Sequence, residues 1–276
     1  MARNPRIKRL RRLTTQRKAR SQERAFVVEG PSIVAEAIGA DEAVSPLRSG
    51  LAVEAVYVEQ GYRPDLTERA ATAGVEVVPV APGVLGGVLN TRSPQPIAAV
   101  IAEVPASIDD IPATGPVPLL VDPADPGNLG TLIRSAEAAG AAGVVVCGDA
   151  VDPTNPKVLR AAAGAALRLP VVVVAETDEA LAALRAPSRP ILATVLGPDA
   201  VPYDTTDLAD AVLVLGNEAH GLPPAVIAAA DGRITIPFAG PTESLNLAVA
   251  GSVLCFESLR QRRSGGNWEG ESNTAK

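Results

Sequence analysis

The chain has 276 residues, of which 47% are hydrophobic and 20% are charged, so it can bury a large core and is not globally disordered. Aromatic residues make up only 3%, so the core must consist of Ala, Val, Leu and Ile, as in buried parallel strands and their covering helices. No apolar run reaches the ~18 residues of a membrane span, and the Arg-rich start lacks a secretory h-region. We therefore expect a cytoplasmic protein without a membrane partner; an organellar transit peptide is the alternative for this start.

The net charge of −6 is unevenly distributed along the chain. Residues 1–24 carry ten basic side chains and one acidic one, a local charge of +9, whereas the remaining 252 residues carry 15 basic and 30 acidic groups, or −15. This distribution predicts a basic arm that contacts phosphates locally, on an acidic body that does not bind nucleic acid at large. A solvated, frayed terminus is the alternative.

The two cysteines, Cys147 and Cys255, both lie in apolar segments. The sequence contains no CxxC motif and no His/Cys cluster, and it has a single histidine. We therefore expect buried, reduced thiols and no metal site.

The first hundred residues alternate between strand-like and helical patterns. RAFVVEG (24–30), VEAVYVE (53–59) and VEVVPV (75–80) read as strands, and PSIVAEAIGA and DLTERAATAG as helices. A further strand follows in PIAAVIAEV. These patterns predict a small α/β domain over residues 25–104, and the Pro-rich, acidic segment 105–117 predicts a linker.

A second α/β domain is expected over residues 118–263. It begins with the strand PLLV and a glycine-bearing loop, and it continues through VVVVAE, ILATVLG, AVLVLG, RITIPF and a final helix, SLNLAVAGSVLCFESLRQRR. Strand–helix alternation predicts a parallel sheet covered on both faces. The polar, Gly-rich end, residues 264–276, predicts a disordered tail.

The first candidate motif is DPADPGNLGTLIRSAEAAG, where Asn128 can cap a helix. Arg134 has only Gly130 and Gly127 at the positions four and seven residues before it. Because helical side chains lean toward the N-terminus, we expect Arg134 to reach back over bare backbone to an anion site at the loop. An amphipathic helix with a surface arginine is the alternative.

The second motif is LVLGNEAHGL, an apolar strand followed by a loop between Gly216 and Gly221. This loop is expected at the carboxyl edge of the sheet, where open α/β sheets bind ligands. Glu218 is placed to orient a cation or a hydroxyl. His220 is given no catalytic role, because it has no partner histidine or nucleophile beside it.

The third motif is IPFAGPTESLNLAVAGSVL. We expect the helix to begin near Glu243–Ser244 and to be capped by Ser244 or Thr242. Asn246 is then a polar residue in the first turn of an apolar helix, and it needs a hydrogen-bond partner in a loop or ligand. The neighbours expected to be buried are Leu245, Leu247 and Val249.

Together, NLGTLIR, LGNEAHGL and IPFAGPTESLNLAVA resemble the three motifs of the SpoU (TrmH-like) branch of SPOUT RNA methyltransferases, over residues 118–262. The first hundred residues resemble the L30e-like substrate-binding domain found before this domain. Ala248 departs from the family pattern, because serine is common there. The resemblance implies an α/β fold in which a deep trefoil knot forms in the C-terminal domain, an exception to the rule that chains do not knot. It also implies a homodimer.

The resemblance implies S-adenosylmethionine as cofactor and methyl transfer to a ribose 2′-hydroxyl. Matching functional positions are Asn128, Arg134, Glu218, Ser244 and Asn246, and cofactor positions are Leu196, Gly197, Leu215, Gly216, Ile236 and Leu245. Family accounts make the arginine a general base. A guanidinium is a reluctant base, so stabilising the alkoxide or clamping a phosphate is the other reading.

The presence of the L30e-like domain favours 23S ribosomal RNA as the substrate, with transfer RNA as the alternative. A third possibility is a non-catalytic RNA-binding protein of ribosome assembly. The RNA-binding residues expected in the basic arm are Arg6, Lys8, Arg9, Arg11, Arg12, Arg17, Lys18 and Arg20.

Overall fold

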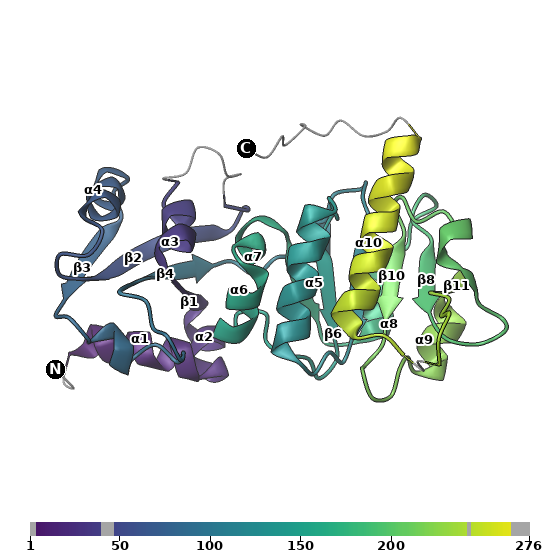
Figure 1. Ribbon diagram of the computed structural model, residues 1–276, viewed down its shortest axis with the longest axis horizontal. Helices are drawn as coiled ribbons and strands as arrows, with labels where there is room; N and C mark the ends of the chain where they lie inside the picture. Colours follow the sequence, from purple (N-terminus) through teal and green to yellow (C-terminus); the bar gives the residue numbers. More distant parts are fainter. Residues whose placement is uncertain (1–3, 40–46, 242–243, 266–276) are drawn as a thin grey trace.

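The computed structural model describes residues 4–39, 47–241 and 244–265. Within these ranges the chain forms two α/β domains that lie side by side, with α6 and α7 between the two sheets (Figure 1). The predicted tail falls outside the described residues from position 266 onward, as do Thr242 and Glu243.

The N-terminal domain is built on a four-stranded sheet in the order β1-β4-β2-β3. The strand β4 runs antiparallel to β1 and β2, whereas β2 and β3 are parallel. Its elements are α1 (Pro5–Thr15), α2 (Arg17–Glu23), β1 (Ala25–Glu29), α3 (Pro31–Ala37), β2 (Leu51–Glu59), α4 (Pro64–Thr72), β3 (Glu76–Val80), the 3-10 turn η1 (Leu85–Gly87) and β4 (Ile97–Glu103).

The basic segment differs from the separate arm expected from its charge. It forms α1 and α2, which pack on one face of the small sheet. Leu10 and Leu13 are fully buried there beside Val27 and Val100. Because an apolar stripe runs through the basic residues, the segment belongs to the core of the domain, and its charges lie on the outer faces of the two helices.

The C-terminal domain is built on a seven-stranded sheet in the order β7-β6-β5-β10-β8-β11-β9, and every pairing described in it is parallel. Its strands are β5 (Val117–Val121), β6 (Val144–Cys147), β7 (Val171–Val174), β8 (Ile191–Thr194), β9 (Val201–Pro202), β10 (Val212–Leu215) and β11 (Gly232–Thr235). The remaining elements are η2 (Ile108–Asp110), α5 (Pro126–Ala138), α6 (Pro156–Ala162), α7 (Ala165–Arg168), α8 (Thr177–Leu184), η3 (Tyr203–Thr205), α9 (Pro224–Ala229) and α10 (Leu247–Ser264).

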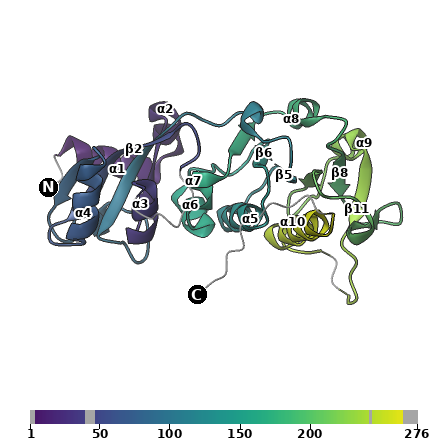
Figure 2. The ribbon, with the colours of Figure 1, turned by 90° about the horizontal axis from the view of Figure 1, so that it is seen from above.

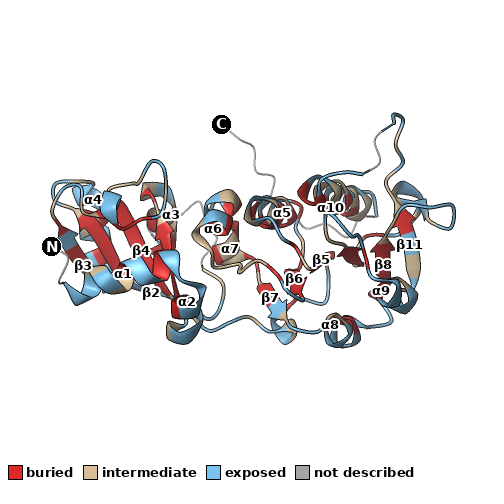
Figure 3. Cartoon of the chain, turned by 90° about the horizontal axis from the view of Figure 1, so that it is seen from below, coloured by how far each residue is buried: buried red, intermediate tan, exposed pale blue. Residues whose placement is uncertain are grey.

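Helices cover both faces of the large sheet, as the continuous apolar strands predict. The helices α5, α6 and α10 lie on one face, and α8 and α9 on the other (Figure 2). Alternate residues of one strand therefore enter different cores: Val144 and Val146 face α5, whereas Val145 and Cys147 face α8. Buried residues concentrate on the strands and on the helix sides turned toward them (Figure 3).

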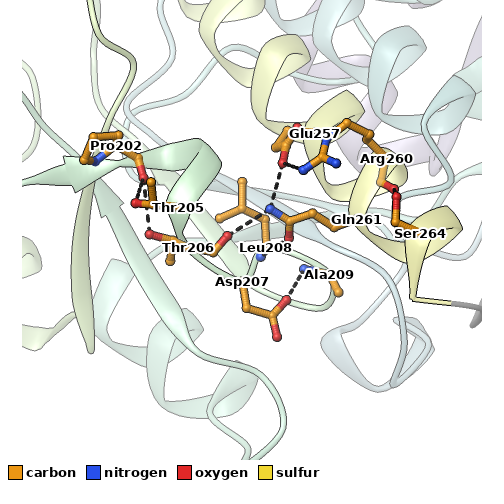
Figure 4. A network of polar contacts seen from close by, with 10 residues as sticks. All are labelled: Pro202, Thr205, Thr206, Asp207, Leu208, Ala209, Glu257, Arg260, Gln261 and Ser264. Carbon is orange, nitrogen blue, oxygen red and sulfur yellow. Dashed lines mark hydrogen bonds and ion pairs between the residues drawn. The ribbon is translucent and has the colours of Figure 1, made fainter.

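The helix α10 begins at Leu247, later than expected from the sequence, because Asn246 is its N-cap. Near its other end, the Gln261 side chain donates to the Thr206 carbonyl (2.9 Å) and accepts from the Leu208 N–H (2.8 Å) (Figure 4). The Ser258 hydroxyl also donates to the Ala209 carbonyl (3.1 Å). These contacts hold the C-terminal half of α10 on the loop before β10.

Candidate active site

The three motifs meet at the carboxyl edge of the large sheet. The helices α5 and α10 both begin at this edge, the lower one in Figure 1, and the loop after β10 lies beside them. Asn128 is in the first turn of α5, Glu218 is in the loop, and Asn246 begins α10. Parallel strands bring their carboxyl ends to one edge, so residues distant in sequence become neighbours there.

Two hydrogen bonds join these three side chains into a chain. The Asn246 Nδ2 donates to Asn128 Oδ1 (2.8 Å), and the Asn128 Nδ2 donates to Glu218 Oε1 (2.8 Å). The remaining Asn246 oxygen accepts from the N–H groups of Ala248 (2.9 Å) and Val249 (3.3 Å). The need for a partner at Asn246 is thus met by a helix cap and by Asn128.

The cap of α5 differs from the expected one. Asp125 caps this helix by accepting from the N–H of Asn128 (2.8 Å). The expectation that Asn128 is the cap was therefore wrong, because the helix begins at Pro126. This shift leaves both side-chain groups of Asn128 available for Asn246 and Glu218.

The loop after β10 is closed by its own backbone and by Asn217, a residue that the motif analysis did not single out. The Gly221 N–H donates to the Asn217 carbonyl (2.9 Å), and Asn217 Oδ1 accepts from Ala219 N–H (2.8 Å). Asn217 Nδ2 donates to the carbonyl of Asp122, after β5 (2.7 Å). The turn is so tight that a Cβ at Gly216 would lie 2.3 Å from the carbonyl carbon of Gly221.

A cavity of about 520 Å³ opens beside this loop, at the ends of β8, β10 and β11. Its size lies within the range of small-molecule sites. Five of the six expected cofactor residues line it, together with Glu218 and Ser244; Gly197 follows the lining residue Leu196. The five are Leu196, Leu215, Gly216, Ile236 and Leu245.

Thr194, at the end of β8, also lines this cavity and was missed by the sequence reasoning. Its hydroxyl oxygen is buried and has no hydrogen-bond partner among the described residues. A buried hydroxyl without a partner is unfavourable unless a ligand or water satisfies it. The apolar walls, the exposed loop backbone and this hydroxyl fit a cofactor that has both apolar and polar parts.

Arg134 is not joined by a hydrogen bond or an ion pair to the three linked side chains. It is exposed, and it makes no hydrogen bond or ion pair with the described residues. The expected open path along α5 is absent, because a Cβ at Gly130 would lie 2.4 Å from the Val158 carbonyl oxygen of α6. Gly130 therefore serves the close packing of two helices, and that face of α5 is occupied.

The other residues of the second and third motifs are mostly exposed. His220 is exposed, and its described contact is a backbone N–H donated to Asn217 Oδ1 (3.3 Å). Ser244 is exposed, while Ala248 is packed in the core, so a serine hydroxyl there would be buried. The expected burial of Leu245 and Val249 was wrong: Leu245, which precedes α10, is 36% exposed, and Val249, in its first turn, is 49% exposed.

The basic residues of α1 and α2 fall into two groups. Lys8, Arg11 and Lys18 are exposed without an ion pair to the described residues, and Arg17 is exposed and donates to the Ala150 carbonyl (3.1 Å). Four others are held by acidic side chains: Arg6 by Glu76, Arg9 by Glu23 and Glu54, Arg12 by Glu23, and Arg20 by Asp152. Arg20 is only 6% exposed, so an RNA contact by its side chain is excluded in this conformation.

Neither cysteine takes part in the site. Both thiols are buried, and burial raises the pKa of each to about 12. No cluster of three potential metal ligands occurs in the part of the chain that the structure describes. Within the same residues, no helix has the length and apolarity to cross a membrane.

Comparison with known proteins agrees with this geometry. Residues 117–256 match the SpoU rRNA Methylase family, and residues 4–99 match the MRM3-like substrate binding domain. The fold is that of an RNA methyltransferase of the SPOUT type. The chain belongs to the SpoU rRNA Methylase family, and the predicted pairing with a substrate-binding domain is confirmed.

Individual relatives are similar over most of their length. The 23S rRNA (guanosine(2553)-2′-O)-methyltransferase RlmP of Bacillus subtilis is 32% identical over 260 residues, covering 92% of this chain and 96% of that protein. The 23S rRNA (uridine(2479)-2′-O)-methyltransferase of Streptomyces viridochromogenes is 35% identical over 206 residues, covering 72% of each chain. The crystal structure of an AdoMet-bound rRNA methyltransferase from Sinorhizobium meliloti has a TM-score of 0.81 and 30% identity, covering 94% of this chain and 95% of that one.

Proposed function

We propose that the protein transfers a methyl group from S-adenosylmethionine to a ribose 2′-hydroxyl of 23S ribosomal RNA. The observation that carries this proposal is the hydrogen-bonded chain Asn246–Asn128–Glu218 beside the cavity at the carboxyl edge. The cofactor would supply an electrophilic methyl group. The side chains of this enzyme then have to orient the hydroxyl for in-line attack and to help remove its proton.

The cavity residues would hold the cofactor mainly through backbone groups of the loops after β8 and β10. Leu215, Ile236 and Leu245 form apolar walls, and the Thr194 hydroxyl offers a free polar group. Gly216 allows the loop backbone to close tightly at the cavity wall. The trefoil knot stays a prediction of the family resemblance.

Glu218 is the side chain of the three that is placed to contact the substrate. It lines the cavity, and one of its carboxylate oxygens, Oε1, is held by Asn128. An oriented carboxylate can accept the hydrogen bond of a ribose hydroxyl and so fix the direction of its lone pairs. Asn128 and Asn246 then act by holding Glu218 in position, and Ser244 lies at the cavity rim.

Arg134 is assigned to stabilising negative charge on the RNA, either the developing alkoxide or an adjacent phosphate. Its exposure and its lack of a partner among the described residues suit a group that awaits a ligand. A guanidinium offers five donors in a planar fork that matches phosphate, and it gives up a proton reluctantly. Stabilisation of negative charge is therefore favoured over the role of general base for Arg134.

We further propose a homodimer in which the site lies at the interface. Leu245, Val249 and Phe256 are 36%, 49% and 48% exposed, and the last two are seven residues apart on one side of α10. An exposed apolar stripe of this kind is typical of a covered surface. The stripe begins next to Asn246, so a second copy packed on it would lie close to the site.

The proposal is tested by measuring S-adenosylmethionine binding by calorimetry and labelled methyl transfer to protein-free 23S rRNA and to transfer RNA. Cofactor binding with transfer to 23S rRNA alone is expected. Transfer to transfer RNA alone would contradict the substrate assignment. RNA binding without cofactor binding would instead indicate the non-catalytic ribosome-assembly protein.

A further inference from the structure

The two domains share a continuous buried contact. Leu159 of α6 and Leu167 of α7, both from the C-terminal domain, are buried in the core of the N-terminal domain beside Phe26 and Val28. The Arg48 N–H also donates to the Leu167 carbonyl (2.8 Å). The buried apolar side chains hold the domains together, and polar contacts of defined geometry add to this packing.

Directional contacts are made by Arg20 of α2. Its Nη2 and Nε lie 2.5 and 2.9 Å from Asp152 Oδ2, and its Nη1 donates to the Leu13 carbonyl (3.0 Å). The Nε is also 3.3 Å from the Thr154 hydroxyl. Arg20 and Asp152 are 6% and 13% exposed, so this ion pair is shielded from solvent. It ties a helix of the N-terminal domain to the loop between β6 and α6.

That loop is connected to the candidate active site. The Asp149 N–H donates to Asp122 Oδ1 (2.8 Å), and the Val151 N–H donates to the Pro123 carbonyl (3.0 Å). The Asp122 carbonyl accepts from Asn217, which precedes Glu218. Hydrogen bonds and short stretches of backbone therefore connect α2, through the loop 148–155 and Asp122, to the loop that carries Glu218.

A second tether lies on the opposite side of the domain interface. Arg168 of α7 contacts Glu36 of α3 and Glu137 of α5, so one guanidinium joins three helices of both domains. In Figure 1, α2 lies at the lower edge of the interface and α3 at the upper edge. Arg160 of α6 also lies 4.0 Å from Glu29 of β1. Ion pairs at several points around an apolar contact resist rotation of one domain against the other.

We propose that the Arg20–Asp152 pair sets the orientation of the substrate-binding domain, so that RNA held on α1 and α2 reaches the Glu218 site at one fixed distance. This inference rests on the proposed function. Arg20 is then a positioning residue that acts on the choice of nucleotide, while the exposed Lys8, Arg11 and Lys18 contact the RNA itself. The basic segment thus contains both a surface that binds RNA and a buried residue that orients this surface relative to the Glu218 site.

The experiment compares Arg20→Ala, Arg20→Lys and Asp152→Asn with wild type in methylation of protein-free 23S rRNA. We expect kcat/KM to fall at least tenfold in Arg20→Ala and Asp152→Asn and methylation to spread to neighbouring riboses, with an unchanged Kd for S-adenosylmethionine. Arg20→Lys keeps the positive charge but lacks the planar guanidinium, so its kcat/KM should lie between those of Arg20→Ala and wild type. The matched control is Arg63→Ala, which removes an exposed ion pair within the N-terminal domain.

A measurement of the distance between the two domains tests the inference independently of methyl transfer. Spin labels at Thr72→Cys on α4 and Ala183→Cys on α8 report the domain separation, since both native cysteines are buried. Labelled protein is diluted with an excess of unlabelled protein, so that a proposed homodimer carries labels on one chain only. Wild type should then give one narrow distance distribution, and Arg20→Ala and Asp152→Asn a broad one. Folded variants with wild-type product positions and a narrow distribution would overturn the inference, as would parallel loss of cofactor affinity and activity. An inactive wild-type protein would contradict the proposed function. The distance distributions would still show whether the Arg20–Asp152 pair fixes the orientation of the two domains.

Discussion

The side-chain amide of Asn246 donates to the side-chain oxygen of Asn128 over 2.8 Å, although 118 residues separate them in the sequence. Asn246 also caps α10, so one residue starts a helix and holds the first motif in place. Because Asn128 in turn donates a hydrogen bond to Glu218, the three motifs are joined into one unit. Loss of any of these contacts should therefore affect the direction of the Glu218 carboxylate.

Substitution of Asn246 should separate its two roles. Asn246→Asp keeps an oxygen that can cap α10 but replaces the donor to Asn128 with a carboxylate oxygen. We expect stability close to wild type and methyl transfer lowered by about 100-fold, as for a small misplacement of reacting groups. Asn246→Ala should lose activity similarly and also lower the free energy of unfolding by about 1 kcal/mol. Urea unfolding and single-turnover methylation measure the two effects, and full activity of Asn246→Asp would contradict this role.

Gly216→Ala should damage the cofactor cavity. The added Cβ would lie 2.3 to 2.5 Å from backbone atoms of Gly221 and Leu222, so the loop has to move. Overpacking of this kind costs about 1–3 kcal/mol of stability. The affinity for S-adenosylmethionine should fall, as measured by calorimetry. The matched control is Gly87→Ala, because a Cβ at Gly87 meets no atom within 4 Å; equal affinities for both variants would argue against a role of the Gly216 turn in the cavity.

Arg134→Lys distinguishes the proposed roles of the arginine. Since Arg134 is exposed and without partners among the described residues, neither stability nor cofactor affinity should change. Loss of a planar, multidentate donor should lower the rate of transfer by about 100-fold or more. Activity retained at the wild-type rate, with only weaker RNA binding, would exclude both the base role and the bidentate role.

The homodimer should depend on the apolar stripe of α10. Phe256→Glu places a charge at a side chain that is 48% exposed in the single chain, so the fold itself should be preserved. In a dimer the same charge would be buried without a partner and should shift the protein to a monomer. Analytical ultracentrifugation measures the oligomeric state. A wild-type protein that is monomeric at micromolar concentration would contradict the proposed interface.

The buried thiols predict a loss of stability at alkaline pH. An unfolded thiol ionises with a pKa near ~8.5, whereas burial holds the pKa of Cys147 and Cys255 at about 12. The thiol contribution is therefore fully present below pH ~8.5 and is lost as the pH rises toward about 12. A Cys147→Ala, Cys255→Ala double variant should show a smaller decrease in unfolding free energy over that range. Identical pH profiles of the two proteins would contradict this expectation.

The sequence predicted the parallel sheet, the edge at which the site lies and seven of the residues that line the cavity, because strand periodicity and the three motifs are local signals. It did not predict that Asp125 and Asn246 are the helix caps, since several polar residues compete at each helix start. The role of Gly130 required knowledge of where α6 packs. Arg20 was assigned to RNA because charge in the sequence does not reveal a buried acidic partner 132 residues away. Thr194 carries no motif signal at all.

The most direct test is transfer of labelled methyl groups from S-adenosylmethionine to protein-free 23S rRNA, followed by mapping of the blocked 2′-hydroxyl. We predict one methylated ribose, whose rate of methylation falls by about 100-fold in Asn246→Asp and Arg134→Lys while both variants still bind the cofactor. A methyl group on a base, or no transfer to RNA by a wild-type protein that binds the cofactor, would contradict the account.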